Sequence, residues 1–215
     1  MLLTGLKEEI FLLIFSLALA CVLISADQLI KYLVVLNFDE CRGAVRTYYT
    51  LSIGDFDVFS LTHIRNDGAA WSILGGQTIL LVIFTSVVML AILVYMIVKR
   101  KSMNKLETLA LAVILAGGIG NLIDRARILI DPDFSGVIDY ILLDFLPEFP
   151  VFNFADICIV VGGIGLCLIY LVLEIKDHKR KKLSQTAATE AHVPQAGGAE
   201  ENSAAQPGNE TDAEV

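Results

Sequence analysis

The sequence is poor in the residues that build disulfide frameworks, metal centres and nucleophilic triads. Its four cysteines form no CxxC pair, and its three histidines are far apart along the chain. These shortages argue against a disulfide framework, a zinc site, and a Ser-His or Cys-His nucleophile. The glycine-rich run at 117–120 lacks the GK[ST] that follows in a phosphate loop. We therefore expect no metal, no organic cofactor and no nucleic-acid partner.

Basic residues are missing from the end of the sequence. Residues 184–215 contain neither Lys nor Arg but hold several acids, so they supply much of the net charge of −8. Ala, Gly, Glu, Ser, Thr and Pro dominate there, and such a composition cannot bury enough apolar surface to fold. We expect residues 184–215 to form a disordered acidic tail and residues 1–183 to form the folded domain.

The rest of the chain is too apolar for an ordinary soluble domain. Hydrophobic residues make up 55% of the sequence, and the mean hydropathy is +0.67. The apolar residues gather into runs that are long enough to cross a bilayer as helices. The four predicted spans are about 10–26, 78–98, 106–123 and 155–175.

The first of these runs could be mistaken for a cleaved signal peptide. The sequence ALAC at Ala18–Cys21 is similar to the box at which bacterial lipoproteins are cut. However, Ala18 occupies the position where that box has a large aliphatic residue, and the apolar run continues to Ile24. We therefore expect an uncleaved helix.

Two basic segments predict the orientation in the membrane. The loop 99–105 and the segment 176–182 are rich in Lys and Arg, which the positive-inside rule places in the cytoplasm. Four spans then put the N- and C-termini in the cytoplasm, the acidic tail included. Residues 27–77 and 125–155 face outward, and the polar motifs of the chain all fall at or near that extracytoplasmic face.

A small β-sheet is expected in the first outward region, at about residues 32–64. The segments 33–38, 45–52 and 56–64 are short, rich in β-branched or aromatic residues, and separated by glycines. The expected fold class is thus an all-α membrane protein, with four transmembrane helices and a small extracytoplasmic β-sheet.

Two carboxylates dominate the second outward region. Asp139 and Asp156 are embedded in apolar residues beside the fourth span, where an ionisable group is costly and is taken as functional by default. Two close acids share one proton, so that the ionised acid activates water while the protonated one polarises a carbonyl. A simpler interpretation applies to Asp156 alone, because Asn153 and Asp156 match a capping box at a helix start. That interpretation leaves Asp139 unexplained.

Other polar motifs have both structural and functional interpretations. Asp27 and Lys31 lie four residues apart and can neutralise each other at the membrane border. Residues 66–72 form either a turn with an interfacial Trp71 or a loop that lines the site, with Asn66 as a polar contact. Asn121, Asp124 and Arg125 form either a helix end with a charge pair or a polar shelf. On such a shelf Arg125 would hold a substrate carbonyl or a lipid phosphate.

Taken together, these motifs resemble one family, the lipoprotein signal peptidases, or signal peptidase II, of bacterial inner membranes. The resemblance covers about residues 10–175. Five motifs carry it in the family's order: DQLIK (Asp27–Lys31), NDGAAWS (Asn66–Ser72), GGIGNLIDR (Gly117–Arg125), GVIDY (Gly136–Tyr140) and FNFAD (Phe152–Asp156).

The resemblance implies an intramembrane aspartyl endopeptidase that globomycin inhibits. Such an enzyme cuts membrane-embedded prolipoproteins before a cysteine that carries a diacylglyceryl group. The catalytic positions of the family fall on Asp139 and Asp156. Its supporting polar positions fall on Asp27, Lys31, Asn66, Gly68, Asn121, Arg125 and Asn153.

This sequence departs from the family pattern in three places. Ile30 replaces a frequent Thr, which removes a hydroxyl contact, and Trp71 replaces the commoner Phe. The acidic tail has no counterpart in the family's core. Two other classes stay open: another intramembrane aspartyl protease such as a prepilin peptidase, which needs a GxGD element and cytoplasmic acids, and a non-enzymatic four-span scaffold or small transporter.

Overall fold

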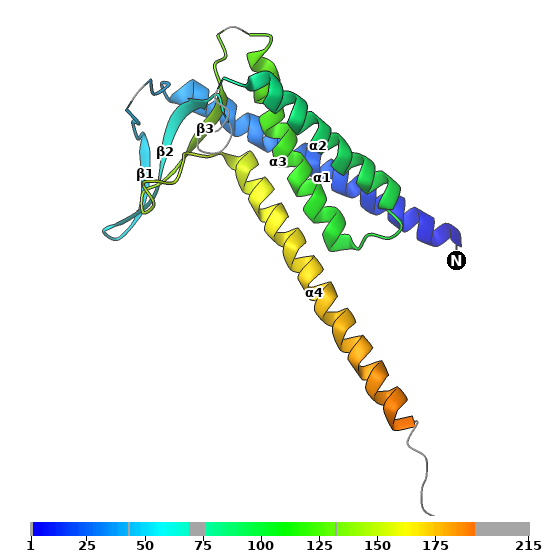
Figure 1. Cartoon of the computed structure of the whole chain (residues 1–215). Helices are drawn as coiled ribbons and strands as arrows, with labels where there is room; N and C mark the ends of the chain where they lie inside the picture. Colours follow the sequence, from blue (N-terminus) through cyan, green and yellow to red (C-terminus); the bar gives the residue numbers. More distant parts are fainter. Residues whose placement is uncertain (1, 43, 69–75, 132, 192–215) are drawn as a thin grey trace, which may run out of the picture. The chain divides into compact units, whose positions relative to one another are not determined.

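The computed structural model describes residues 2–42, 44–68, 76–131 and 133–191, and the side chains among them from Lys7 to Gln185. The chain divides into two units, one ending at Val172 and the other starting at Leu173. The elements in chain order are α1 (Leu2–Asn37), β1 (Tyr49–Ile53), β2 (Phe56–Asn66), α2 (Thr78–Lys99), α3 (Lys105–Ile128), β3 (Val137–Leu143) and α4 (Phe154–Ala191) (Figure 1).

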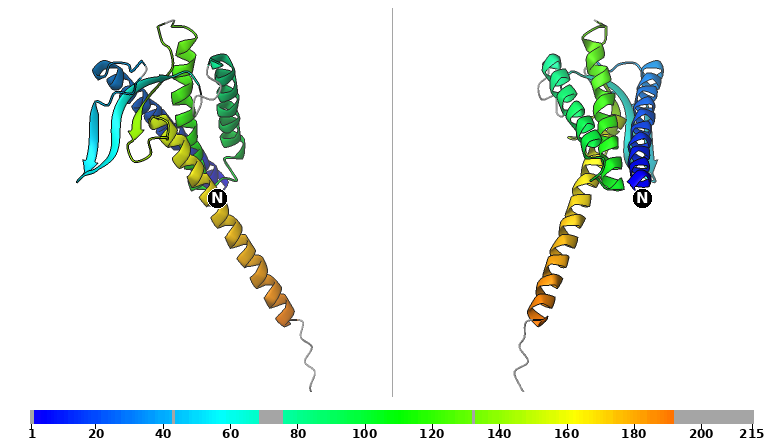
Figure 2. Two further views of the ribbon diagram at one scale, coloured as in Figure 1. Left: turned by 60° about the vertical axis from the view of Figure 1, so that its left-hand side comes forward. Right: turned by 90° about the vertical axis from the view of Figure 1, so that its right-hand side faces the viewer.

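The described helices include four that are long and apolar enough to cross a membrane, namely Lys7–Asn37, Thr78–Lys99, Lys105–Ile128 and Phe154–Gln185. The predicted fold class, four spans with a small sheet, is confirmed. Helix α3 lies between α1 and α2 (Figure 2). Its most apolar window is 61% buried, against 11–17% for the other three helices, so α3 is the centre around which they pack.

The glycine-rich run of α3 allows three helices to approach it at one level. A Cβ added to Gly118 would overlap the Met89 side chain of α2, and one added to Gly117 would overlap the backbone oxygen of Ala155 in α4. A Cβ on Gly120 would lie 2.7 Å from Oδ2 of Asp27 in α1. Small residues at helix contacts permit such close approach in membranes.

A buried acid ties the helices together towards the start of α3. Tyr95 of α2 and Tyr170 of α4 both donate to Oε1 of Glu107, over 3.3 and 2.6 Å. Asn104 caps α3 by accepting from the backbone N of Glu107. Sequence analysis did not single out Glu107. Its acidic side chain three residues after an Asn is a helix-start signal that could have identified it.

The sheet is antiparallel, with the order β1-β2-β3. β3 contacts α1 and α3, and β1 lies at the far edge (Figure 1). The Phe134 side chain, between α3 and β3, packs with Val34 of α1 and with Ile138 and Tyr140 of β3. This second apolar cluster joins the sheet to the helices.

The prediction of a strand at residues 33–38 is wrong, because α1 continues to Asn37. Leu33–Phe38 is rich in β-branched and aromatic residues. In the helix, however, the side chain of Val34 packs in the buried cluster under β3. Tertiary packing thus overrides the local β preference. The other two predicted strands correspond to β1 and β2, with β1 starting later, at Tyr49, and β2 extending to Asn66.

Two further features differ from the expectations. β3, which carries Asp139, was not predicted as a strand; it pairs with β2, more than seventy positions earlier in the chain. Helix α4 continues to Ala191, so residues 184–191 of the expected disordered tail are helical. The rest of that tail lies outside the described residues.

We expect Gly162→Ala to destabilise the fold, because a Cβ there would lie 2.7 Å from Cγ1 of Ile114 and 2.9 Å from the backbone oxygen of Ala110. Overpacking of this kind costs about 1–3 kcal/mol. Gly163 is the matched control, since a Cβ there meets nothing within 4 Å. Thermal unfolding of the purified variants should show a lower midpoint for Gly162→Ala alone. Equal midpoints would contradict this packing of α4 on α3.

Candidate active site

The segment between β3 and α4 brings the two predicted catalytic acids together. Asp139 is the third residue of β3, and Asp156 is the third residue of α4. Residue Phe152, just before α4, pairs back onto Ile141 of β3 through two backbone hydrogen bonds, of 2.8 and 3.0 Å. This pairing turns the start of α4 towards the strand and places both carboxylates beside Asn153.

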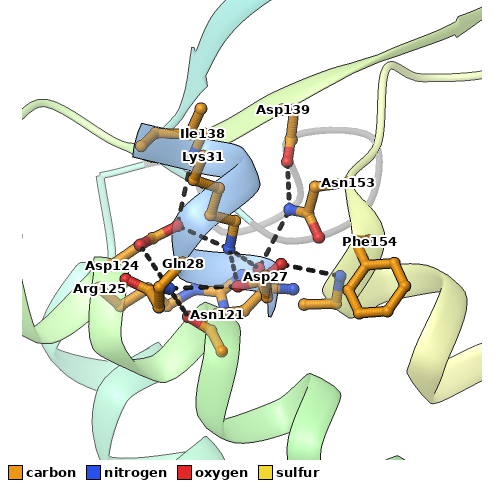
Figure 3. A network of polar contacts seen from close by, with 12 residues as sticks. Asp27, Gln28, Lys31, Asn121, Asp124, Arg125, Ile138, Asp139, Asn153 and Phe154 are labelled. Atoms are coloured by element: carbon orange, nitrogen blue, oxygen red, sulfur yellow. Dashed lines mark hydrogen bonds and ion pairs between the residues drawn. The ribbon is translucent and has the colours of Figure 1, made fainter. Parts of the chain in front are cut away.

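Asn153 contacts both acids. Its Nδ2 donates to Oδ1 of Asp139 over 2.6 Å (Figure 3), and its backbone N donates to Oδ2 of Asp156 over 3.1 Å. Its Oδ1 accepts from the backbone N of Asp156 over 3.0 Å. The last two bonds form the reciprocal capping box that the sequence predicts. Asp156 therefore caps α4, and its carboxylate and that of Asp139 both accept from the same residue, Asn153.

Two more asparagines complete the contacts of the acids. Asn66, the last residue of β2, donates from Nδ2 to Oδ2 of Asp139 over 3.0 Å. Asn121 of α3 donates from Nδ2 to Oδ1 of Asp156 over 2.7 Å. Each carboxylate is thus held by side-chain amides from other elements, which fixes the direction in which its free lone pairs point.

The environment of Asp139 favours its protonated form. Its side chain is 2% exposed. Burial is the main cause that raises the pKa of Asp139 from 3.8 to about 7, and the charge of Asp156 adds to it. The amides of Asn66 and Asn153 act in the opposite direction because they donate to the ionised form. Asp139 is therefore suited to hold a proton near neutral pH.

A buried ammonium group lies behind the acids. Nζ of Lys31 is 2.9 Å from Oδ2 of Asp27 and 2.8 Å from Oδ2 of Asp124, and it donates to Oδ1 of Asn121 over 3.0 Å. Lys31 and both carboxylates are almost fully buried. All three ammonium protons have acceptors, which a buried charge requires. The Asp27–Lys31 pair predicted at the membrane border is thus part of a larger cluster.

This cluster orients Asn121. Its Oδ1 accepts from both Lys31 and Nδ2 of Asn153, over 3.0 Å each. Because two donors face this atom, the amide must direct its Nδ2 at Asp156. Oδ1 of Asp27 also accepts from the backbone N of Ala155, so α1 contacts the first turn of α4 directly. Lys31 therefore affects the acids indirectly, through Asn121 and Asp27.

Arg125 anchors the end of β2. Its Nη2 donates to the backbone oxygen of Gly68 over 3.2 Å, and the backbone N of Gly68 donates to Oδ1 of Asn66 over 3.0 Å. The same Asn66 contacts Asp139, so these residues form a chain of contacts. Nε of Arg125 is buried and has no hydrogen-bond partner among the described residues. The guanidinium therefore keeps a donor for a further acceptor.

The acids open into a cavity of about 470 Å³. Polar side chains, including Arg125 and the three asparagines, line one part of it. The rest is apolar and comes from residues 149–152 and from Val137, Ile159 and Val160. Its volume is typical of a ligand site. Such a cavity can hold a polar group against the acids while apolar chains contact its other wall.

All nine residues predicted from the motifs lie in this network. They are Asp27, Lys31, Asn66, Gly68, Asn121, Arg125, Asp139, Asn153 and Asp156. Residues 69–75, with Trp71, lie outside the described part of the chain. Their neighbours Asp67 and Gly68 are described.

Three contributing residues were missing from the predicted set. Asp124 pairs with Lys31 rather than forming a border pair with Arg125, and Gln28 donates to Asp27 and Asp124. Tyr140 accepts from the backbone N of Phe154. The helical spacing of Asn121 and Asp124 was the available signal, because residues three apart share a helix face. Within the described residues, no three His, Cys, Asp or Glu side chains are grouped as metal ligands would be.

Comparisons with known proteins agree with this geometry. Residues 19–173 match the family model described as Signal peptidase (SPase) II. A lipoprotein signal peptidase of Enterococcus faecalis is 36% identical, and the match covers 80% of this chain and 96% of the relative. One from Bacillus subtilis is 35% identical, with 76% and 96% covered.

A solved structure of a bacterial membrane enzyme, determined by the in meso method at 2.3 Å resolution, has a similar fold. The TM-score is 0.61 at 29% identity, and the match covers 76% of this chain and 90% of that structure. The family match begins within α1, ends within α4, and includes α2, α3 and both acids. The chain is thus a multi-pass membrane protein and a protease, and it belongs to the signal peptidase II family.

Proposed function

We propose that this protein is an aspartyl endopeptidase that removes signal peptides from diacylglyceryl-modified prolipoproteins by cutting before the lipidated cysteine. One observation carries the proposal: Asp139 and Asp156 both accept hydrogen bonds from Asn153, one from its side-chain amide and the other from its backbone N, at the wall of one cavity. The relatives' name, lipoprotein signal peptidase, supports the substrate class. Membrane lipid surrounds the enzyme, and globomycin is the expected inhibitor.

In the proposed mechanism the two acids share one proton. Ionised Asp156 takes a proton from a water molecule, whose oxygen attacks the carbonyl carbon of the scissile peptide bond. Protonated Asp139 gives its proton to the carbonyl oxygen, which forms a neutral gem-diol. Collapse of the diol breaks the C–N bond. The departing amine receives the proton held by Asp156, and Asp139 regains its own from the diol hydroxyl.

The surrounding residues bind and orient the peptide in this proposal. Arg125 offers its unpaired Nε to a backbone carbonyl of the substrate. The apolar wall at residues 149–152, Ile159 and Val160 contacts the lipid chains and the apolar part of the signal peptide. Lys31 does not touch the substrate. Lys31 orients Asn121, and Asn121 in turn orients Asp156.

We further propose that the protein lies in the bacterial inner membrane with both termini in the cytoplasm and the acids at the extracytoplasmic face. The basic loop after α2 supports the placement of both termini in the cytoplasm. The acids lie near the end of α3 and the start of α4, at the opposite ends of these helices from that basic loop. A site on the outer face requires this position. A lipidated substrate is itself membrane-embedded, so its scissile bond meets the acids at the right depth.

Replacing either acid should abolish cleavage while leaving the fold intact. Asp139→Asn and Asp156→Asn each remove one proton-transfer group, which costs roughly 10²–10⁴-fold or more in rate. The measurement is a gel-shift assay on a diacylglyceryl-modified prolipoprotein, with thermal unfolding of each variant as a check on folding. Asp57→Asn is the control, because that carboxylate lies in an exposed part of the sheet. Processing at the wild-type rate by both acid variants would rule out the dyad.

The raised pKa of Asp139 predicts a pH-dependent stability and rate. The folded protein keeps a proton on this group up to about pH 7, whereas the unfolded chain releases it near pH 3.8. The resulting stability is therefore complete below pH 3.8 and is lost as pH rises through 7. Cleavage should slow over the same upper range, because Asp139 must donate a proton.

The measurement is the unfolding midpoint and the cleavage rate of the wild type at several pH values from 5 to 9. Asp139→Asn cannot titrate, so its unfolding midpoint should lack the fall that the wild type shows between pH 5 and about 7. Identical stability profiles for the two proteins would disprove the raised pKa.

A further inference from the structure

A second cavity, of about 180 Å³, lies on the other side of the buried ammonium cluster. Lys31 and Asp124 separate it from the acids. Its other walls include Arg65 of β2, Arg127 of α3 and the ring of Phe134. The proposed peptidase mechanism uses neither arginine.

Phe134 holds two positive charges close together. The guanidinium carbon of Arg65 lies 4.2 Å from the centre of its ring, and that of Arg127 lies 4.5 Å from it. A cation over an aromatic face is stabilised by the ring. The two guanidinium groups nevertheless repel each other: burial does most to lower the pKa of Arg65, and the charge of Arg127 lowers it further. A compact anion between them would offset that repulsion.

Two donors of Arg65 are unused within the described part of the chain. Its Nε and Nη1 are buried and have no hydrogen-bond partner among the described residues. Burial is the largest cause of the lowered pKa of Arg65, which measures the cost of desolvating its charge. An arginine side chain stays charged under these conditions. Buried donors without partners call for a bound ion or water.

The carboxylates near Arg65 form no ion pair with it among the described residues. Glu40 favours the charged form of Arg65, but its own pair is with Arg42, over 3.7 Å. Asp124 already faces Lys31 and accepts from Gln28 and from the backbone N of Ile138. Asp131 is 3.6 Å from Arg127. The cavity lining thus holds three cationic side chains, Lys31, Arg65 and Arg127, beside one carboxylate, Asp124.

The cavity also reaches the lipid-facing side of α1. Tyr32 and Val35 belong to its lining, and both are exposed on that helix, within its membrane-spanning part. A headgroup in the cavity could thus leave its acyl chains along α1. Tyrosine suits this boundary, where its ring is apolar and its hydroxyl stays wet.

We propose that this cavity binds a phosphate group through Arg65 and Arg127. Arginine pairs geometrically with phosphate oxygens and is weakly hydrated, so it recognises phosphate better than a lysine would. A phospholipid headgroup and free phosphate share this chemistry. The proposal goes beyond the peptidase activity, because the site is separate from the acids and would be occupied without any substrate.

The test is thermal unfolding of the full-length protein, purified in a non-ionic detergent. Three additions are compared: dioleoylphosphatidylglycerol, dioleoylglycerol as the same lipid without phosphate, and sodium phosphate against sodium chloride at equal ionic strength. Ligand at about 100 times its dissociation constant should raise the unfolding midpoint by roughly 5 °C. Stabilisation by phosphatidylglycerol alone identifies a lipid headgroup. Equal stabilisation by sodium phosphate identifies the free anion. Both results support the site.

The variants Arg65→Gln and Arg127→Gln should each remove most of this shift. Arg46→Gln is the matched control, since its side chain is exposed and makes only a 4.0 Å contact with Asp39. Arg127 is exposed as well, so Arg127→Gln tests the site even where Arg65→Gln fails to fold. A full shift in Arg127→Gln would overturn the proposal. So would a wild type that phosphatidylglycerol and phosphate stabilise no more than dioleoylglycerol and chloride do.

Discussion

The ammonium group of Lys31 is the interaction on which the arrangement of this protein depends. It is fully buried, and two carboxylates and one amide oxygen surround it. Removing one partner of such a cluster costs about 3–5 kcal/mol, because an uncompensated charge is left inside the protein. The cluster joins α1 to α3, while Asp27 contacts the start of α4 and Asp124 the backbone of β3. Each element that carries an acid therefore contacts it.

The two acids are not equivalent, because their local structures differ. Asp156 begins a helix and takes part in a reciprocal cap, which suits a carboxylate. Asp139 lies in a strand, is almost fully buried, and accepts from the side chains of Asn66 and Asn153 rather than from the backbone of a helix start. The difference between the two acids arises from secondary structure and burial. An asymmetric pair is what the proposed proton transfers require.

The sequence was sufficient to predict the helices and most of the site, for physical reasons. Apolar runs of spanning length can satisfy their backbone only as helices, and the motifs fall at the helix ends. What it could not predict came from contacts between distant segments. β3 was missed because a strand is defined by its partner, here β2. Leu33–Phe38 was assigned wrongly because Val34 packs under Phe134, a contact that no local pattern reveals. The pairing of Asp124 with Lys31 depends on the packing of α1 against α3.

The three glycines of α3 have a mechanical consequence. Gly117, Gly118 and Gly120 contact α4, α2 and α1 at one level, so none of these helices can tilt there without disturbing the central one. Tilting α4 alone would draw Ala155 away from both Gly117 and the carboxylate of Asp27. The helices are therefore held in fixed positions at this level of the bundle. Any widening that admits a bulky chain therefore falls to residues 149–152, which line the cavity outside the helices.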